Sequence, residues 1–292
     1  MNLRNLKKIP FAAYIDLTKP RILLMVLVTT ALGFFLGGKG IASWPLLFVT
    51  LLGTALSCGG ASALNHYLER DVDGKMERTK NRPLPKGIIT PQNALSFGVI
   101  LTLSGVIILD TYVNLLTAFL SLLTAFLYIL VYTPMKRLSW LNTTIGAIPG
   151  AIPPMGGWAA ASGDLGVGAW VLFFILFAWQ HPHFYSIAWM FKEDYGRGGF
   201  KMLPVVEPDG KKTFLHIRIF AVLLILVSTL PTVIGMSGYV YLTGAMIAGT
   251  VVFLLGVSLS SSKSLPAARR LLRATVIYLP LLLFLIVLDA GF

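Results

Sequence analysis

The chain has 292 residues, of which 56% are hydrophobic and only 12% are charged, and its mean hydropathy is +0.78. This composition excludes an ordinary soluble protein and is typical of an integral membrane protein. The single cysteine, Cys58, excludes an internal disulfide and a multi-cysteine metal site. We attribute the formal charge of +12 to loops that face lipid headgroups, and not to a nucleic-acid partner.

Nine stretches are long and apolar enough to cross a membrane, since a spanning helix needs about 20 mostly apolar residues. They are residues 22–38, 43–64, 93–109, 112–132, 141–161, 167–189, 219–236, 239–259 and 271–288. These runs are continuous and do not alternate in polarity, which argues against a transmembrane β-barrel. We therefore predict an all-α polytopic membrane protein, with nine transmembrane helices in one bundle around a central cavity, and one domain over residues 1–292.

The basic residues are unevenly divided between the two sides of such a bundle. With nine spans, the N-terminal tail and four loops share one side, and 23 of the 24 Lys and Arg residues fall there. Only Lys39 falls on the other side. By the positive-inside rule the basic side is cytoplasmic. We therefore expect a multi-pass protein of the cell membrane, with its N-terminus in the cytoplasm and its C-terminus outside.

A polar stretch follows the second span with no turn residue before Gly74. If the helix continues, positions four apart differ by about 40° of rotation, so Asn65, Glu69 and Asp73 form one stripe. Oxygen ligands suit Mg²⁺, which takes one or two carboxylates and completes its shell with water and substrate phosphate. The alternative is ordinary salt bridging at a helix end. The spacing of the three residues, and the cost of leaving the Asn65 amide unpaired in an apolar span, favour a Mg²⁺ site.

Cations follow this stripe directly, at Arg78, Lys80, Arg82 and Lys86. Positive side chains beside a carboxylate stripe at a membrane surface are suited to holding a phosphate group. The sequence therefore predicts a phosphate-binding surface next to the metal site.

A second polar group closes the sixth span. His181 and His183 lie within the apolar run, and Lys192 and Asp194 follow it. Polar side chains inside a membrane usually face a bundle interior or a cavity. For the two histidines, packing and a functional role remain equally open. The Gly- and Pro-rich span 141–161 is expected to be an irregular helix that is buried or lines a cavity.

Three segments together resemble the intramembrane prenyltransferases, and within them the haem-farnesylating branch. They are NHYLERDVDGKMERTKNRPLP from Asn65, YTPMKRLSWLNTTIGAIPGAIPPMGGW from Tyr132 and WQHPHFYSIAWMFKEDYGRGGFKMLP from Trp179. The broader family shows the pattern NDxxDxxxD. Its Asn, second Asp and third Asp fall here on Asn65, Glu69 and Asp73, while His66 stands in place of the first Asp.

The resemblance implies transfer of a farnesyl group from farnesyl diphosphate to the 2-vinyl group of protohaem IX (haem B), with addition of water, to give haem O. It implies Mg²⁺ as cofactor, with the three stripe residues as its ligands. The residues that the resemblance implies as catalytic are Asn65, Glu69, Asp73, Lys192 and Asp194; those implied for diphosphate binding are Arg78, Arg82, Lys136 and Arg137; those implied for haem binding are His181 and His183. An aromatic such as Tyr132 would stabilise the allylic cation.

The partners expected from the resemblance are farnesyl diphosphate, haem B and the lipid bilayer, with no nucleic acid. Contact with haem A synthase or with cytochrome oxidase assembly is a further expectation.

Two other functions stay open. The same chemistry could prenylate an aromatic acid, a quinone precursor or a lipid headgroup, although the HPHF and YTPMKR segments favour haem. A secondary transporter also has broken helices and intramembrane charges, but here the charges gather at one surface.

Overall fold

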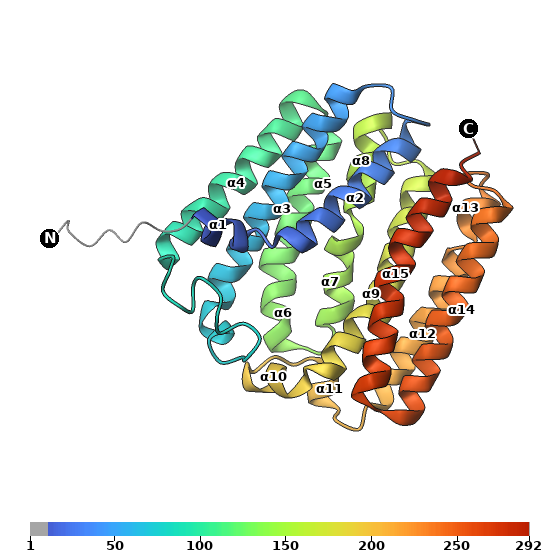
Figure 1. Cartoon of the computed structure of the whole chain (residues 1–292). Coiled ribbons are helices and arrows are strands. Elements are labelled where there is room, and N and C mark those ends of the chain that lie inside the picture. Colours follow the sequence, from blue (N-terminus) through green and yellow to red (C-terminus); the bar gives the residue numbers. More distant parts are fainter. Residues whose placement is uncertain (1–10, 292) are drawn as a thin grey trace, which may run out of the picture.

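The computed structural model describes residues 11–291, and in this range all regular structure is helical apart from one isolated bridge between Ser237 and Ala290. Eight helical segments of this range are long and apolar enough to cross a membrane. They are α2 (Pro20–Gly37), α3 (Trp44–Asp73), α4 (Pro91–Tyr112), the continuous segment Leu115–Leu138, α9 (Val167–Met190), the segment Lys211–Val233, α14 (Tyr239–Ser262) and α15 (Leu265–Leu288). The all-α membrane prediction is confirmed, and Figure 1 shows the helices as one bundle.

Two of these segments are composite. Leu115–Leu138 consists of α5 (Leu115–Phe126), the π-helical turn η2 (Leu127–Tyr132) and α6 (Thr133–Leu138). Lys211–Val233 consists of α12 (Lys211–Val227) and α13 (Leu230–Val233). Three short helices lie outside the spans, namely α1 (Phe11–Leu17), α10 (Lys192–Arg197) and α11 (Leu203–Val206).

The predicted span 141–161 is divided into α7 (Asn142–Ala151) and α8 (Pro153–Ser162), which follow one another through the bundle (Figure 1). Pro153 lacks a backbone N–H, so the helix is interrupted at Ile152. The Gln180 amide of α9 donates to the carbonyl of Ala147 at 3.0 Å, so a backbone group of this irregular segment gains an extra partner inside the protein. Because each half is short, the count of nine spans stays a prediction.

Several helices extend beyond the boundaries expected from hydropathy, most of all α3 and α12. The helix of the second span continues to Asp73, as the stripe requires, and α12 begins at Lys211 although the apolar run was expected to begin at 219. Apolar runs mark the part of a helix that lies in lipid, whereas the hydrogen-bonded backbone can continue into the polar headgroup region. Hydropathy therefore places the spans but underestimates the helices.

Close backbone contacts fix how the first helices pack. A Cβ atom at Gly157 of α8 would overlap the carbonyl oxygen of Thr30 in α2, and one at Gly33 of α2 would overlap the carbonyl oxygen of Pro154 in α8. The small residues of the second span are used in the same way, since Gly60 of α3 lies directly against the α4 backbone at Gly98. Small residues allow helices to approach closely in membranes, where packing replaces the hydrophobic effect as the driving force.

We expect Gly157→Ala to destabilise the protein, because the added methyl group meets backbone that cannot move aside. Overpacking of this kind costs about 1–3 kcal/mol, which exceeds the gain of about 1 kcal/mol from replacing a helical Gly by Ala. Gly156→Ala is the matched control, since a Cβ there has no neighbouring atom within 4 Å. Thermal unfolding of the purified protein should show a lower Tm for Gly157→Ala only. Equal Tm values for the two variants would contradict this packing.

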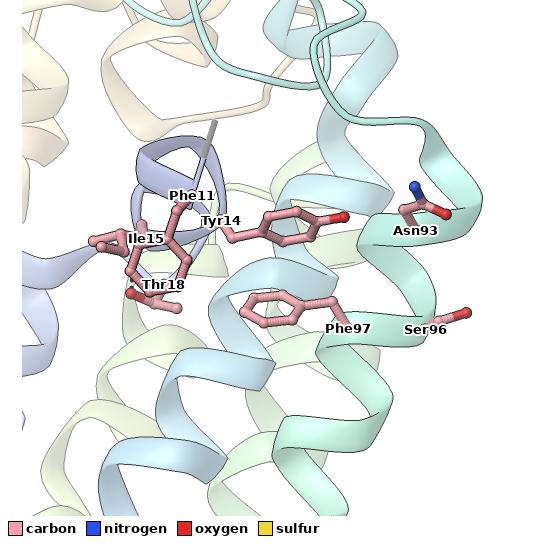
Figure 2. A pocket seen from close by; sticks show the side chains of 7 residues that line it. All are labelled: Phe11, Tyr14, Ile15, Thr18, Asn93, Ser96 and Phe97. Atoms are coloured by element: carbon pink, nitrogen blue, oxygen red, sulfur yellow. Dashed lines mark hydrogen bonds between the residues drawn. The ribbon is translucent and has the colours of Figure 1, made fainter. Parts of the chain in front are cut away.

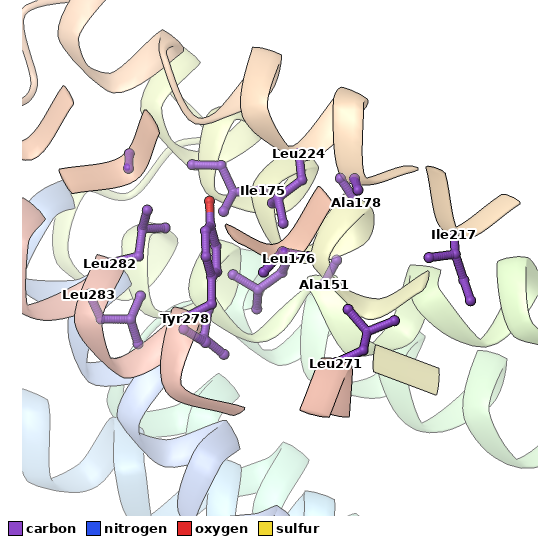
Figure 3. Packing of buried hydrophobic residues seen from close by; sticks show 14 of the residues in the cluster. Ala151, Ile175, Leu176, Ala178, Ile217, Leu224, Leu271, Tyr278, Leu282 and Leu283 are labelled. Atoms are coloured by element: carbon purple, nitrogen blue, oxygen red, sulfur yellow. The ribbon is translucent and has the colours of Figure 1, made fainter. Parts of the chain in front are cut away.

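The main hydrophobic core lies in the C-terminal half of the bundle. Figure 3 shows side chains of α7, α9, α12 and α15 packed together, among them Ala151, Ile175, Leu176, Ala178, Ile217, Leu224, Leu271, Tyr278, Leu282 and Leu283. Large hydrophobic side chains also cover the outside of the spans, for example Ile100, Leu115 and Phe284. Apolar surface of this extent on an isolated chain is suited to contact with lipid.

Shallow hollows open on the surface of the described residues. One of about 660 Å³ lies between α1 and α4, where Figure 2 shows Tyr14 beside Phe97, with ring centres 4.9 Å apart. Another of about 450 Å³ is lined by residues of α13 and α14 and of the segments next to them. Neither includes a residue of the polar stripe, so the central cavity stays a prediction.

Candidate active site

The polar stripe of α3 is buried within the protein. The exposed fractions of Asn65, Glu69 and Asp73 are 0%, 6% and 1%. Because α3 is continuous to Asp73, the three side chains share one face of the helix. Carboxylates are almost never fully buried without a partner, so their burial calls for compensating charge.

That charge comes from three cations on other segments. The pairs are Lys19 Nζ with Asn65 Oδ1, Lys136 Nζ with Glu69 Oε1 at 2.7 Å, and Arg82 Nη1 with Asp73 Oδ1 and Oδ2 at 2.8 and 2.7 Å. The Asn65 amide also donates to Thr133 Oγ1 at 3.0 Å. The stripe, at the C-terminal end of α3, is therefore lined by positive groups, one of them from α6.

Lys19 is a site residue that sequence reasoning missed. It precedes α2 in a left-handed backbone conformation, with φ of 52°, and its ammonium group also donates to Tyr128 Oη at 3.0 Å. In the sequence it stands among the basic residues of the N-terminal tail, which the positive-inside rule already explains. No local pattern distinguished it from those cations.

The π-helical turn η2 places aromatic rings beside two of these cations. Tyr128 and Tyr132 stack with ring centres 5.7 Å apart, and Lys136 Nζ lies 4.7 Å from the Tyr132 ring centre. On α7, Gly146 packs directly on the Tyr132 ring, where a Cβ would meet it. π-helical turns are frequent at functional sites, and aromatic faces attract positive charge. The site therefore combines buried oxygen ligands, cations and electron-rich rings.

The oxygen atoms of the stripe fit Mg²⁺. One amide and two carboxylates are hard ligands of the kind this ion prefers. Within residues 11–291 no group of three or more His, Cys, Asp or Glu side chains gathers as an all-protein metal cage. Mg²⁺ does not need one, because it usually takes one or two carboxylates and completes its shell with water and phosphate. The donor set thus suits a Mg²⁺ ion bound together with a phosphate-containing substrate.

Asp194 joins the two polar stretches of the sequence. Its carboxylate accepts hydrogen bonds from the backbone N–H of Glu77 at 2.8 Å and of Arg78 at 3.2 Å, and it pairs with Arg197 at 2.8 Å. Burial tends to raise the pKa of this carboxyl group, but the bonds from Arg197 and the two amides outweigh it and hold the pKa below its usual value. The contact is therefore present at neutral pH and is lost only as the pH falls through this lowered pKa.

The other cations predicted for the site, Arg78, Arg137 and Lys192, do not contact the stripe and lie in three different places. The Arg78 guanidinium lies 5.6 Å from the Phe191 ring centre, next to the loop that Asp194 holds. Arg137 is exposed on α6. Lys192 Nζ lies 4.5 Å from the ring centre of Trp189, which places it beside α9 and not beside the stripe. The structure thus brings Arg82 and Lys136 directly to the stripe, with Arg78 on the adjoining loop.

The two histidines of α9 have different surroundings. His181 is fully buried, its Nδ1 lies 2.8 Å from the Phe177 carbonyl, its Nε2 lies 3.2 Å from Thr144 Oγ1, and its ring stacks on Phe220. Both of its ring nitrogens are therefore engaged inside the protein.

His183 is half-buried and keeps one nitrogen available. Its Nδ1 lies 3.0 Å from Thr275 Oγ1, and that hydroxyl donates its own proton to the Leu272 carbonyl at 2.7 Å. The Nδ1–H must then be the donor, which leaves a lone pair on Nε2. The Trp179 ring stacks on the imidazole with a centre-to-centre distance of 4.8 Å. Of the two residues, only His183 has a ring nitrogen with no hydrogen-bond partner among residues 11–291.

Comparison with known proteins identifies this arrangement. The model of the UbiA prenyltransferase family matches residues 26–286. The chain belongs to this family. A protoheme IX farnesyltransferase of Solibacter usitatus (strain Ellin6076) is 48% identical over 285 residues, which cover 94% of this chain and 98% of the relative. One of Salinibacter ruber (strain DSM 13855 / M31) is 44% identical over 276 residues, with 94% and 98% covered.

Solved structures agree on the fold of this prenyltransferase. One described as digeranylgeranylglyceryl phosphate synthase has a TM-score of 0.79 at 16% identity and covers 95% of this chain and 97% of its own. A UbiA homologue of Archaeoglobus fulgidus, bound to DMAPP and Mg²⁺, has a TM-score of 0.67 at 15% identity and covers 94% and 99%. At these identities the likeness concerns the fold alone.

Proposed function

We propose that this chain transfers a farnesyl group from farnesyl diphosphate to haem B and so produces haem O. The observation that carries the proposal is the buried oxygen stripe with its three cations, because such a site can hold a diphosphate and a divalent ion together. The acceptor follows from the relatives, which are named protoheme IX farnesyltransferases at up to 48% identity over nearly the whole chain.

Asn65, Glu69 and Asp73 would hold Mg²⁺, which when bound stabilises the negative charge that develops on the leaving diphosphate. Lys19, Arg82 and Lys136 now occupy the oxygen atoms of the stripe and can release them when the substrate enters. Arg82 and Lys136, which pair with the two carboxylates, can then contact phosphate oxygens. Arg78 extends this positive surface along the loop that Asp194 fixes. Asp194 is thus a positioning residue for the diphosphate site.

The farnesyl group that loses diphosphate carries an allylic positive charge. The stacked rings of Tyr128 and Tyr132 present electron-rich faces beside the stripe and can stabilise that charge. The surrounding helices exclude bulk water, which would otherwise capture the cation before the vinyl group does.

His183 is the proposed haem-facing residue of α9, because its Nε2 lone pair is available while both nitrogens of His181 are engaged. The site lies at the basic end of the bundle, so we place it at the cytoplasmic face of the cell membrane, with the C-terminus outside. A contact through which haem O passes to haem A synthase or to oxidase assembly proteins completes the proposal.

The proposal is tested with purified protein, haem B, farnesyl diphosphate and Mg²⁺. Haem O should form, and its formation should stop when Mg²⁺ is removed with a chelator and resume when the ion is restored. The control is a parallel reaction in which a prenylatable benzoate replaces haem B. Unchanged haem together with a prenylated benzoate would assign a different acceptor.

A further inference from the structure

His66 is a buried histidine whose polar atoms have no partner in the described part of the chain. Its exposed fraction is 3%, and neither Nδ1 nor Nε2 makes a hydrogen bond. An unsatisfied buried polar group costs about 1–3 kcal/mol, and such groups are rare in folded proteins. Retaining one on the helix that carries the proposed metal site calls for a functional reason.

The position of His66 on α3 directs it to the reaction site. An α-helix turns by about 100° per residue, so His66 lies within about 20° of Asp73 and about 60° of Glu69 around the helix axis. Along the helix axis it lies between Asn65 and Glu69, about 4.5 Å from the level of Glu69 and about 10 Å from that of Asp73.

His66 therefore lies at the inner end of the stripe, next to Asn65 and away from the two carboxylates. The charged oxygen atoms of the substrate belong near Glu69, Asp73 and Arg82, at the end of α3. The farnesyl carbon bonded to diphosphate, and the haem vinyl group that replaces diphosphate, must then lie further towards the membrane interior. His66 is therefore placed near the level where the new carbon–carbon bond forms.

The reaction that yields haem O needs a group at this level. Loss of diphosphate breaks the C–O bond of the farnesyl group, and the terminal vinyl carbon then forms a C–C bond to farnesyl C1. The positive charge moves to the vinyl carbon next to the porphyrin ring. The oxygen of a water molecule forms a C–O bond there, and the proton released passes to the departing diphosphate. Without an ordered water, the same cation instead loses a proton from the adjacent carbon and leaves an alkene.

We infer that His66 holds the water molecule that captures this second cation. The inference rests on the farnesyl transfer to haem proposed above. A neutral imidazole has one donor and one acceptor nitrogen, which is what a single oriented water needs. Asn65 cannot take this role, because its Oδ1 is proposed to bind Mg²⁺ and its Nδ2 donates to Thr133. The nearby cations are suited to anionic phosphate oxygens rather than to a water that must act as nucleophile.

The test compares the products of His66→Phe and His66→Gln, assayed as full-length protein with haem B, farnesyl diphosphate and Mg²⁺, by mass spectrometry. His66→Phe removes both polar atoms, so most of its farnesylated haem should be the alkene, one water lighter than haem O. His66→Gln keeps a donor and an acceptor, so haem O should again predominate. In oxygen-labelled water, the wild-type hydroxyl group should carry the label.

The matched control is His216→Phe, since His216 is half-buried on α12 with its Nδ1 2.8 Å from the Lys212 carbonyl. It should give haem O alone. His66→Leu serves in the same assay if the Phe variant does not fold. Haem O as the sole product of a folded His66→Phe or His66→Leu protein would overturn the inference at any rate of turnover. Failure of the wild-type protein to farnesylate haem would instead overturn the proposed function.

Discussion

Asp73→Asn should lower the rate of farnesyl transfer at least about a hundredfold, a typical loss when a group that stabilises developing charge is removed from an active site. Asn keeps the shape of the side chain but removes the negative charge that is paired with Arg82 at 2.7 Å and proposed to bind Mg²⁺. The initial rate should be measured over a range of Mg²⁺ concentrations. The concentration that gives half-maximal rate should rise, while expression and haem binding persist.

Asp71→Asn is the control for this change in charge. Asp71 lies two residues away on the same helix, but 82% of its side chain is exposed and its nearest cation, Arg70, is 3.9 Å away. An exposed pair of this kind contributes only about 0–1 kcal/mol. Asp71→Asn should therefore turn over like the wild type. Equal rates for Asp73→Asn and the wild type would contradict the proposal that the stripe binds Mg²⁺.

Lys136→Met should impair both folding and substrate binding. Lys136 and Glu69 form a buried pair at 2.7 Å, with side chains 14% and 7% exposed. Removing one partner of a buried pair costs about 3–5 kcal/mol, because the other charge stays buried without compensation. The Tm should fall, and the KM for farnesyl diphosphate should rise because a cation proposed to bind diphosphate is lost. Thermal unfolding and initial rates measure the two effects separately.

The double variant Glu69→Gln/Lys136→Met separates stability from catalysis. With both charges gone, the buried site no longer contains an unpaired ion, so the Tm should recover towards the wild-type value. Activity should not recover, since a proposed metal ligand and a phosphate-binding cation are both missing. Lys75→Met, at an exposed position just beyond α3, is the control for loss of one positive charge. A double variant with restored turnover would show that this pair serves stability alone.

The spans could be predicted because lipid leaves few choices to an apolar run of 20 residues. Continuation of the second span through Glu69 and Asp73 could also be predicted, since Gly74 is the first residue of that stretch able to end the helix easily. The break at Ile152 was indicated by its neighbouring prolines, although its two helices, each of ten residues, came only from the structure.

The pairing within the site could not be predicted in the same way. Lys19 and Asn65 are 46 residues apart, and Lys136 and Glu69 are 67 residues apart. The sequence offered Arg78, Arg82, Lys136 and Arg137 as equivalent cations, yet only Arg82 and Lys136 reach the stripe. Similarly, HPHF offers two histidines, and only contacts from α7 and α15 distinguish them.

The sequence by itself determined that the chain is a helical membrane protein with a basic side, and it determined which side chains share a face of α3. Both depend on short-range rules, namely the transfer of apolar residues into lipid and the 3.6-residue turn of the helix. Only the tertiary structure decided which cation meets which oxygen, which histidine keeps a free nitrogen, and that Asp194 fixes the Arg78 loop. Those choices depend on how distant helices pack. Close contacts such as that of Gly157 with the Thr30 backbone determine this packing, and no pattern in the local sequence indicates them.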